Sequence, residues 1–390
     1  MKAKPTILII FGTSGDLVKR YIIPAILELK KSKKINHHFK VIGVTRQVNL
    51  KIDNLIDNKK DSKYADKFMM IHNMDGTKKH NYLSLISEIK KIDEQWQTKA
   101  EIIIYFSLPP KPSLEVAEIL GQIIFFQKRK IKILLEKPFG ENLKTAKIQI
   151  KKLNKYFTEN QIYRVDHYLF KKIINKIDNQ KIKISNKDIE SISVNAFESI
   201  DVSNRLDFYD KVGALKDMIQ SHLLELTAVL LNNSKNIKNP NKNRYETLKN
   251  LELIKQKTQK GQYKGYINPK INPLSQTETF ASIILKSKEK NIDQILITLN
   301  TGKALDQKST YIKIKYKNKK VIFVKEKINQ KHNSYEQVIL SAINSKKDYF
   351  VSKEEVLETW RIINPIISQN KTKLFIYKKG INIEKIKPHF

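Results

Sequence analysis

A short apolar run that ends in a glycine turn is the feature that most constrains this fold. Residues 6–11 read TILIIF, which is typical of a strand buried on both faces. Gly12-Thr-Ser-Gly15 follows directly, and a helical pattern then runs over residues 17–30. A buried strand, a glycine turn and a helix in this order predict the start of a parallel sheet that is covered by helices.

The first part of the chain continues this alternation. Further strand patterns lie at residues 40–45, 101–108 and 131–135, and a helical pattern lies at 113–127. After about residue 166 the apolar residues alternate with polar ones, at 191–196 and 312–317, as in half-exposed antiparallel strands. Helical patterns follow at residues 216–231, 335–343 and 353–368, and the polar stretch 232–244 indicates a surface loop.

Composition limits the class of protein and its compartment. The chain has 390 residues, 40% of them hydrophobic, which suits a globular protein of two or three domains. Cysteine is absent, so disulfides, thiolate zinc sites and cysteine nucleophiles are excluded, and a reducing compartment fits. Because no apolar run near the start approaches the roughly 20 residues that span a bilayer, we expect a cytoplasmic protein with no membrane partner.

The formal net charge of +35 allows two interpretations. It could mark a partner such as nucleic acid, or it could reflect a general enrichment in lysine, asparagine and isoleucine. The lysines are scattered over every segment and no arginine-rich arm is present, which favours the second interpretation. We therefore expect no specific nucleic-acid binding, although weak binding to polyanions at low salt should occur.

The glycine turn carries the chemistry of a phosphate site. Glycines let backbone N–H groups approach a phosphate, and the start of the following helix favours negative charge. The predicted cofactor-binding residues of this turn are Gly12, Thr13, Ser14, Gly15, Asp16 and Leu17. An acidic residue after the second strand would hold the ribose of NAD, but this chain has Arg46, which can pair with the 2′-phosphate of NADP. NADP is thus the predicted cofactor, with NAD possible; an ordinary glycine turn and a surface arginine are the alternatives.

Within residues 163–172, YRVDHYLFKK, the seven positions 166–172 combine an acid, an imidazole, a phenol and two ammonium groups. His167, Tyr168 and Lys171 suit a phosphate, and a helix starting here would place His167 and Lys171 on one face. His222 interrupts the apolar face of a helix, so it is either a core histidine or a base. An Asp–His pair, here Asp166 and His222, is what an enzyme that oxidises a hydroxyl needs.

Lys137 follows the predicted strand at residues 131–135. Ligands of open α/β sheets bind beyond the carboxyl ends of the strands, so this lysine lies in the right region for substrate or cofactor. The alternative is a lysine of the turn after the strand.

Several segments together resemble the glucose-6-phosphate dehydrogenase family, in the family's order and over about residues 6–368. They are FGTSGDL at 11–17, SLPP at 107–110, EKPFG at 136–140, RVDHYL at 164–169, QSHLL at 220–224, GQY at 261–263, TFAS at 279–282, TGKAL at 301–305 and TWRI at 359–362.

The resemblance implies a Rossmann-like NADP-binding domain at residues 1–165. An α+β domain with a large, mostly antiparallel sheet would follow at 166–390 and would bind substrate and form a homodimer. It implies oxidation of glucose 6-phosphate at C1 to 6-phosphogluconolactone, with His222 as base and Asp166 as its partner. The substrate-binding residues that it implies are Lys137, His167, Tyr168, Lys171, Glu198, Asp217, Lys303 and Lys308, and Lys137 would also touch the cofactor.

The chain departs from the family pattern at several points. Phe170 stands where glycine is usual, Ser221 replaces an asparagine, and Lys308 replaces an arginine of many relatives. A Gln-Pro-containing strand and the segment after it are missing between about residues 316 and 335, which shortens the sheet that forms the family's dimer interface. The shortened sheet and Phe170 leave a dehydrogenase of another phosphosugar as an alternative function, and the net charge of +35 leaves a non-catalytic basic binding protein as another.

Overall fold

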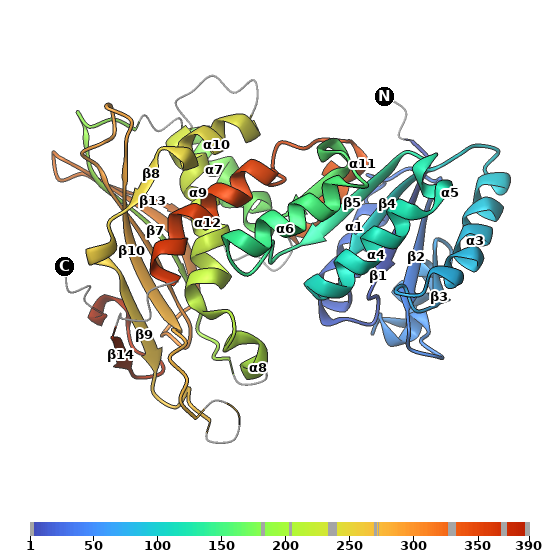
Figure 1. Ribbon diagram of the computed structural model, residues 1–390, viewed down its shortest axis with the longest axis horizontal. Coiled ribbons are helices and arrows are strands. Elements are labelled where there is room, and N and C mark those ends of the chain that lie inside the picture. The colour runs from blue at the N-terminus through green and yellow to red at the C-terminus, as the bar shows by residue number, and fades with distance from the viewer. Residues whose placement is uncertain are drawn as a thin grey trace. The chain divides into compact units, whose positions relative to one another are not determined.

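The computed structural model describes residues 4–180, 184–202, 205–232, 240–268, 271, 273–326, 333–367 and 373–386. The chain forms two compact units, each with its own sheet (Figure 1). The first unit consists of Met1–Gly140, Lys147–Phe170 and Asn329–Lys353; the second consists of Glu141–Ala146, Lys171–Ile328 and Glu354–Phe390. The predicted division into cofactor and substrate domains at residues 165 and 166 stays a prediction, because compactness does not say what each unit binds.

The sheet of the first unit has six strands, and all its pairings are parallel, in the order β3-β2-β1-β4-β5-β6. The strands are β1 (Thr6–Phe11), β2 (Phe39–Thr45), β3 (Met69–Asn73), β4 (Glu101–Phe106), β5 (Ile131–Glu136) and β6 (Ile162–Val165). Every residue of β1 and β4 is buried, which explains their continuous apolar sequence. The predicted Rossmann-like architecture is confirmed, and the strand order reverses between β1 and β4.

Helices and short turns connect these strands. They are η1 (Val18–Ile22), α1 (Ile23–Lys31), η2 (Ile52–Asn54), α2 (Lys59–Ala65), η3 (Lys79–Asn81), α3 (Tyr82–Gln95), α4 (Pro110–Gln122), α5 (Ile124–Gln127), α6 (Leu143–Asn154), η4 (Glu159–Gln161) and η5 (His167–Phe170). The predicted helix at 17–30 begins with a π-helical turn, and the one at 113–127 is broken between α4 and α5.

The helix predicted at residues 335–343 is α11 (Ser334–Ile343). With α11 the chain returns to the first unit, and the sequence pattern does not reveal this return. Ile339 and Ala342 of α11 lie against Leu8 and Ile103 of the parallel sheet. The buried ammonium of Lys132 donates to the carbonyl of Ala342 at 2.6 Å and pairs with Glu101 at 2.9 Å. A buried cation at the carboxyl end of a helix is electrostatically favourable, so Lys132 holds α11 on the sheet.

The sheet of the second unit has eight strands and is mostly antiparallel, which confirms the predicted fold class. The strands are β7 (Ile189–Phe197), β8 (Leu251–Leu253), β9 (Gln259–Tyr263), β10 (Phe280–Ser287), β11 (Leu296–Gly302), β12 (Ser309–Tyr316), β13 (Val321–Lys325) and β14 (Leu374–Tyr377). Two of the pairings, β7 with β11 and β9 with β14, are parallel. As a result, β7 and β11 end side by side at the same edge.

Helices α9, α10 and α12 lie along one face of this sheet (Figure 1). The helical segments of the second half are α7 (Lys172–Gln180), α8 (Leu206–Tyr209), η7 (Leu215–Leu223), α9 (Leu224–Asn232), α10 (Pro240–Lys249), η8 (Lys255–Lys257), α12 (Lys353–Ile367) and η9 (Ile383–Lys385). The three helices predicted in this half are therefore present, with the first divided into η7 and α9.

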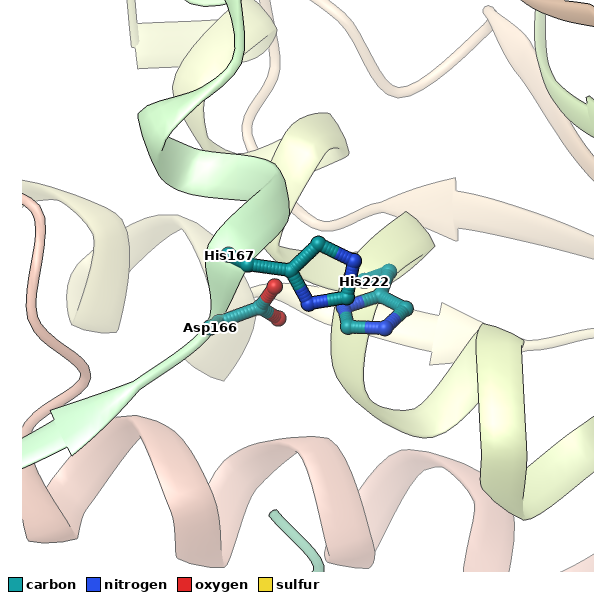
Figure 2. A group of neighbouring side chains, drawn as sticks. All are labelled: Asp166, His167 and His222. Atoms are coloured by element: carbon teal, nitrogen blue, oxygen red, sulfur yellow. The ribbon is translucent and has the colours of Figure 1, made fainter. Parts of the chain in front are cut away.

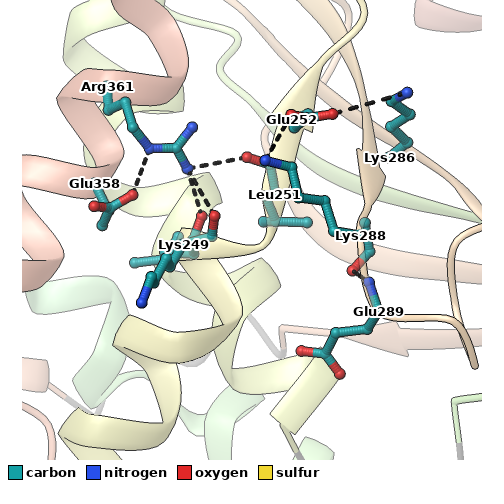
Figure 3. Close-up of polar contacts among 10 residues, drawn as sticks. Lys249, Leu251, Glu252, Lys286, Lys288, Glu289, Glu358 and Arg361 are labelled. Carbon is teal, nitrogen blue, oxygen red and sulfur yellow. Dashed lines mark hydrogen bonds and ion pairs between the residues drawn. The ribbon is translucent and has the colours of Figure 1, made fainter.

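The prediction of a surface loop at residues 232–244 is wrong at its carboxyl end, because α10 begins at Pro240. Residues 233–239 lie outside the described residues. Arg244 of α10 is 2% exposed and bonds to the carboxylate of Glu355 in α12. Arg361 of α12 donates to the carbonyl oxygens of Leu248 and Lys249 at the end of α10 (Figure 3). Polar contacts from a distant helix thus decide the structure of this asparagine-rich sequence.

Candidate active site

The glycine turn lies at the carboxyl end of β1, where the strand order reverses. Gly12 has φ +84°, and a Cβ there would collide with the carbonyl oxygen of Ser107 at the end of β4, so glycine is required. Thr13 is fully buried and its hydroxyl donates to the carbonyl of Ile10 at 2.8 Å. The N–H of Gly15 closes the turn on Gly12 at 3.0 Å, and a helix begins directly afterwards. This backbone fits the pyrophosphate of a dinucleotide.

Arg46 follows β2 and is exposed, which suits contact with a ligand at this edge. The next strand, β3, leads to Asp75, which accepts hydrogen bonds from the N–H and hydroxyl of Thr77 at 2.9 and 2.7 Å. These bonds, with smaller contributions from the charges of Arg46 and Lys78, hold the pKa of Asp75 below its usual value. Arg46 and Lys78 therefore lie close enough to influence the charge of Asp75, at the edge where a Rossmann-like sheet receives the adenosine end of a dinucleotide.

Lys137 directly follows β5, whose last residue is Glu136. The buried hydroxyl of Tyr105 donates to the carboxylate of Glu136, and Tyr335 of α11 is hydrogen-bonded to the same carboxylate. Burial raises the pKa of Glu136 to about 7, against the opposing effects of these bonds and of Lys137. Sequence reasoning missed this network, because Tyr335 reaches it only through the return of the chain to the first unit.

Asp166 follows β6 and is 2% exposed. Its carboxylate accepts the N–H of Tyr168 at 2.9 Å, which starts the 3₁₀ turn η5 that carries His167 (Figure 2). The ring of His167 lies nearly parallel to that of Tyr335, with 6.1 Å between the centroids. The turn ends at Phe170, so the predicted helix that would place His167 and Lys171 on one face does not form here.

His222 is 1% exposed and lies in η7 of the second unit (Figure 2). This segment is a π-helix, in which the N–H of Leu224 donates to the carbonyl of Ile219, five residues earlier in the chain. Side chains five apart, such as Asp217 and His222, therefore share one side of η7. π-Helical turns are rare and often occur at functional sites. Because Asp166 belongs to the first unit and His222 to the second, their pairing stays a prediction.

Lys303, Glu198 and Asp217 form a charged cluster in the second unit. Phe197 and Gly302 are register partners in the parallel pair of β7 and β11, so the residues after them, Glu198 and Lys303, are neighbours. The Lys303 ammonium pairs with the Glu198 carboxylate and lies 3.7 Å from the Asp217 carboxylate. The two acidic side chains remain 26% and 23% exposed, so a polar ligand can reach them. Their contact with each other was not predictable from either strand alone.

The remaining predicted substrate residues are spread more widely. Tyr168 is buried, Lys171 and Lys137 are half-buried, and Lys308 is exposed. Phe170, which stands where the family has glycine, packs edge-on against Phe350 at 5.0 Å. This departure therefore fills the core of the first unit.

Comparisons with known proteins cover nearly the whole chain. Residues 9–176 match the family described as glucose-6-phosphate dehydrogenase, NAD binding domain, and residues 172–333 and 322–385 match the C-terminal domain of the same enzyme. The glucose-6-phosphate 1-dehydrogenase of Buchnera aphidicola (subspecies Schizaphis graminum) is 30% identical, over 96% of this chain and 94% of its own. The glucose-6-phosphate 1-dehydrogenase of Streptococcus pneumoniae is 27% identical, over 96% of this chain and 92% of its own.

A solved structure of glucose-6-phosphate dehydrogenase in complex with glucose 6-phosphate superposes with a TM-score of 0.85. It is 21% identical and the match covers 97% of this chain and 95% of the other, which shows the shared fold. The chain belongs to the glucose-6-phosphate dehydrogenase family, a family of oxidoreductases with an NAD(P)-binding Rossmann-like domain. In the part of the chain that the structure describes, no helix has the length and apolar character needed to cross a membrane.

Proposed function

We propose that the protein oxidises glucose 6-phosphate at C1 to 6-phosphogluconolactone and reduces NADP. The observation that carries this proposal is the match of residues 9–385 to both domains of one dehydrogenase family. The groups that the reaction needs are all present at the positions of the family's motifs. They include a phosphate turn, an imidazole, a carboxylate partner and a cluster of sugar-binding charges.

His222 is the proposed general base, which removes the proton of the C1 hydroxyl as the hydride leaves the same carbon. NADP, when bound, accepts that hydride, so C1 becomes the carbonyl carbon of the lactone. The carboxylate of Asp166 orients the imidazole and stabilises the imidazolium that forms. Both side chains are buried, which limits their contact with water.

The substrate is held at its two ends in this proposal. His167, Tyr168 and Lys171 bind the phosphate, because an imidazole, a phenol and an ammonium offer complementary donors. Glu198, Asp217 and Lys303 bind the sugar hydroxyls as acceptors and donor. The remaining predicted substrate residues, Lys137 and Lys308, add positive charge near the phosphate and the cofactor.

NADP rather than NAD is the proposed cofactor because of Arg46 after β2. Arg46→Ala should raise KM for NADP about tenfold or more, since a guanidinium–phosphate pair is lost, and should leave KM for NAD nearly unchanged. Initial rates with both cofactors measure this. Equal losses with NADP and NAD would show that Arg46 does not read the 2′-phosphate.

The activity test follows the absorbance of reduced nicotinamide in the presence of glucose 6-phosphate and NADP. His222→Asn should lower kcat about 10²–10⁴-fold with little change in the dissociation constant of the sugar. His80→Asn, on an exposed histidine, is the matched control and should keep wild-type rates. Folded wild-type protein without turnover would refute the proposal, and an active His222→Asn would refute the base assignment.

A panel of other sugar phosphates tests the alternative dehydrogenase function. The highest kcat/KM should belong to glucose 6-phosphate, because both the phosphate residues and the sugar acids of the family are retained. A higher kcat/KM for another phosphosugar would change the substrate but keep the reaction type. We also propose a cytoplasmic location, which the absence of cysteine supports.

A homodimer formed through the eight-stranded sheet is proposed as well. Val321 and Phe323 of β13 are 39% and 46% exposed on this sheet, and an apolar edge of this kind favours association. Light scattering after gel filtration should give twice the chain mass of 45.6 kDa, and Phe323→Glu should shift the protein toward the monomer. A monomeric wild type would show that this shortened sheet does not dimerise.

A further inference from the structure

Tyr209 at the end of α8 is a buried tyrosine whose hydroxyl has no hydrogen-bond partner in the described part of the chain. Its side chain is 4% exposed and belongs to an aromatic cluster under the charged residues of the second unit. Burying a hydroxyl without a partner costs free energy that a phenylalanine of the same shape would not cost. The position therefore calls for an explanation.

The other tyrosines of the same cluster all use their hydroxyls. Tyr263 accepts the N–H of Val202 at 3.2 Å, and Tyr266 donates to Asp210 at 2.8 Å. The hydroxyl of Tyr377 is bonded to Thr279 and to the carbonyl of Lys303, each at 2.8 Å. Tyr209 alone among these four lacks such a bond, so its hydroxyl has no role in holding the cluster together.

The ring of Tyr209 supports the charged cluster. The Lys303 ammonium lies 5.1 Å from the centre of this ring, a cation–π contact, while it pairs with Glu198 and lies near Asp217. Burial, with the negative charges of Asp217, Glu278 and Glu198 and the nearby phenol of Tyr377, raises the pKa of Tyr209 well above its usual value. The phenol consequently stays protonated and available as a donor at every working pH.

We propose that Tyr209 is a further sugar-binding residue, an inference that rests on the proposed function. Its ring positions Lys303, and its hydroxyl donates a hydrogen bond to a hydroxyl of the glucose 6-phosphate that Glu198, Asp217 and Lys303 hold. A sugar offers acceptor oxygens on every carbon, which is the chemistry that this unused donor requires.

The test uses Tyr209→Phe, which removes the hydroxyl and keeps the ring under Lys303. The melting temperature should equal or exceed that of the wild type, because an unpaired buried hydroxyl is lost. KM for glucose 6-phosphate should rise about 3- to 10-fold, the value of one neutral hydrogen bond, with KM for the cofactor unchanged.

Thr247→Val is the matched control. Thr247 in α10 is 2% exposed and its hydroxyl also lacks a partner among the described residues, but it lies outside the charged cluster. This variant should gain stability in the same way and keep the wild-type KM. Higher stability with an unchanged KM in Tyr209→Phe, or a melting temperature below the wild type, would overturn the inference.

Deoxy analogues of glucose 6-phosphate identify the hydroxyl concerned. With the wild type, the KM of one analogue should exceed that of glucose 6-phosphate by a similar factor. For the same analogue, Tyr209→Phe should cause no further rise in KM, as in a double-mutant cycle. If the wild type shows no turnover, the proposed function fails, and calorimetric titration with glucose 6-phosphate tests the inference separately. Weaker binding by Tyr209→Phe than by the wild type then supports it, and equal or absent binding by both overturns it.

Discussion

Two clusters in the second unit each join one cation to two carboxylates, and they differ in their access to water. Arg244 lies between Glu225 and Glu355, and the three side chains are at most 2% exposed. Lys303 lies between Glu198 and Asp217, whose side chains are 26% and 23% exposed. Similar charges therefore differ in whether a ligand can reach them, and only the second cluster belongs to the site that we propose for substrate.

The physical cost of each cluster explains this difference. Charges removed from water need partners within the protein, and in the fully buried cluster Arg244 pairs with both carboxylates. Its guanidinium bonds to Glu355 at 2.6 Å and lies 3.5 Å from Glu225, and it joins helices α9, α10 and α12. Partly exposed carboxylates keep some hydration, which an incoming sugar can replace with its own hydroxyls.

Removing the cation of the buried cluster should have the largest effect on stability. Arg244→Met removes the buried cation that pairs with both carboxylates, so the free energy of unfolding should fall by about 3–5 kcal/mol. Urea unfolding at neutral pH measures it. Arg205→Met, on an exposed arginine, is the control and should change stability by less than about 0.5 kcal/mol.

Replacing the two acids as well should recover much of that loss. A triple variant with Arg244→Met, Glu225→Gln and Glu355→Leu replaces all three charges of this cluster, and uncharged replacements of buried ion clusters are often close to neutral for stability. Turnover per folded molecule should remain that of the wild type. A loss of under about 1 kcal/mol in Arg244→Met would show that the two clusters are energetically alike.

The exposed cluster should show the opposite pattern. Lys303→Met should lower kcat/KM for glucose 6-phosphate about 10- to 100-fold, because it removes the charged hydrogen bond that we propose between Lys303 and the substrate. The free energy of unfolding should change by about 1 kcal/mol or less, since water screens the two remaining carboxylates. Steady-state kinetics and urea unfolding on the same preparations measure both, with the exposed Lys313→Met as control. Severe unfolding with normal kinetics would reverse the comparison.

Local sequence patterns were sufficient to predict the strand and the glycine turn that form the proposed cofactor site. The strand predicted at residues 6–11 is β1, residue for residue, because continuous apolar residues identify a strand buried on both faces. The glycine turn after it followed from the same pattern, since Gly12 has the positive φ that glycine tolerates. Parallel pairing then placed the other strand ends at the same edge.

Contacts between distant segments could not be predicted in this way. Lys303 and Glu198 meet because β7 and β11 are parallel partners, and neither strand's sequence encodes its partner's register. Arg244 lies in a polar sequence that indicates a loop, and its pairs with the carboxylates of α9 and α12 make its burial favourable. The resemblance supplied roles for single residues, but Tyr209 and the bonds to Glu136 required the structure.

Glu136 offers a third arrangement, a carboxylate to which two phenols are hydrogen-bonded, and its contribution to stability should depend on pH. Burial raises its pKa from about 4.5 to about 7, so the folded state holds its proton more tightly than the unfolded chain does. The stability that this proton contributes is fully present below pH 4.5 and is lost as the pH rises through 7. The expected slope is at most about 1.4 kcal/mol per pH unit.

Glu136→Gln keeps the shape of the side chain and removes its ionisation. The difference in unfolding free energy between wild type and variant should therefore shrink, and then change sign in favour of the variant, as the pH rises from 5 to 8. Urea unfolding at four pH values in this range measures it, and Tyr105→Phe, which retains the carboxyl, should keep the pH dependence. A pH-independent difference would mean that Glu136 is ionised throughout, and that two phenols stabilise a buried carboxylate as well as the guanidinium stabilises Glu355.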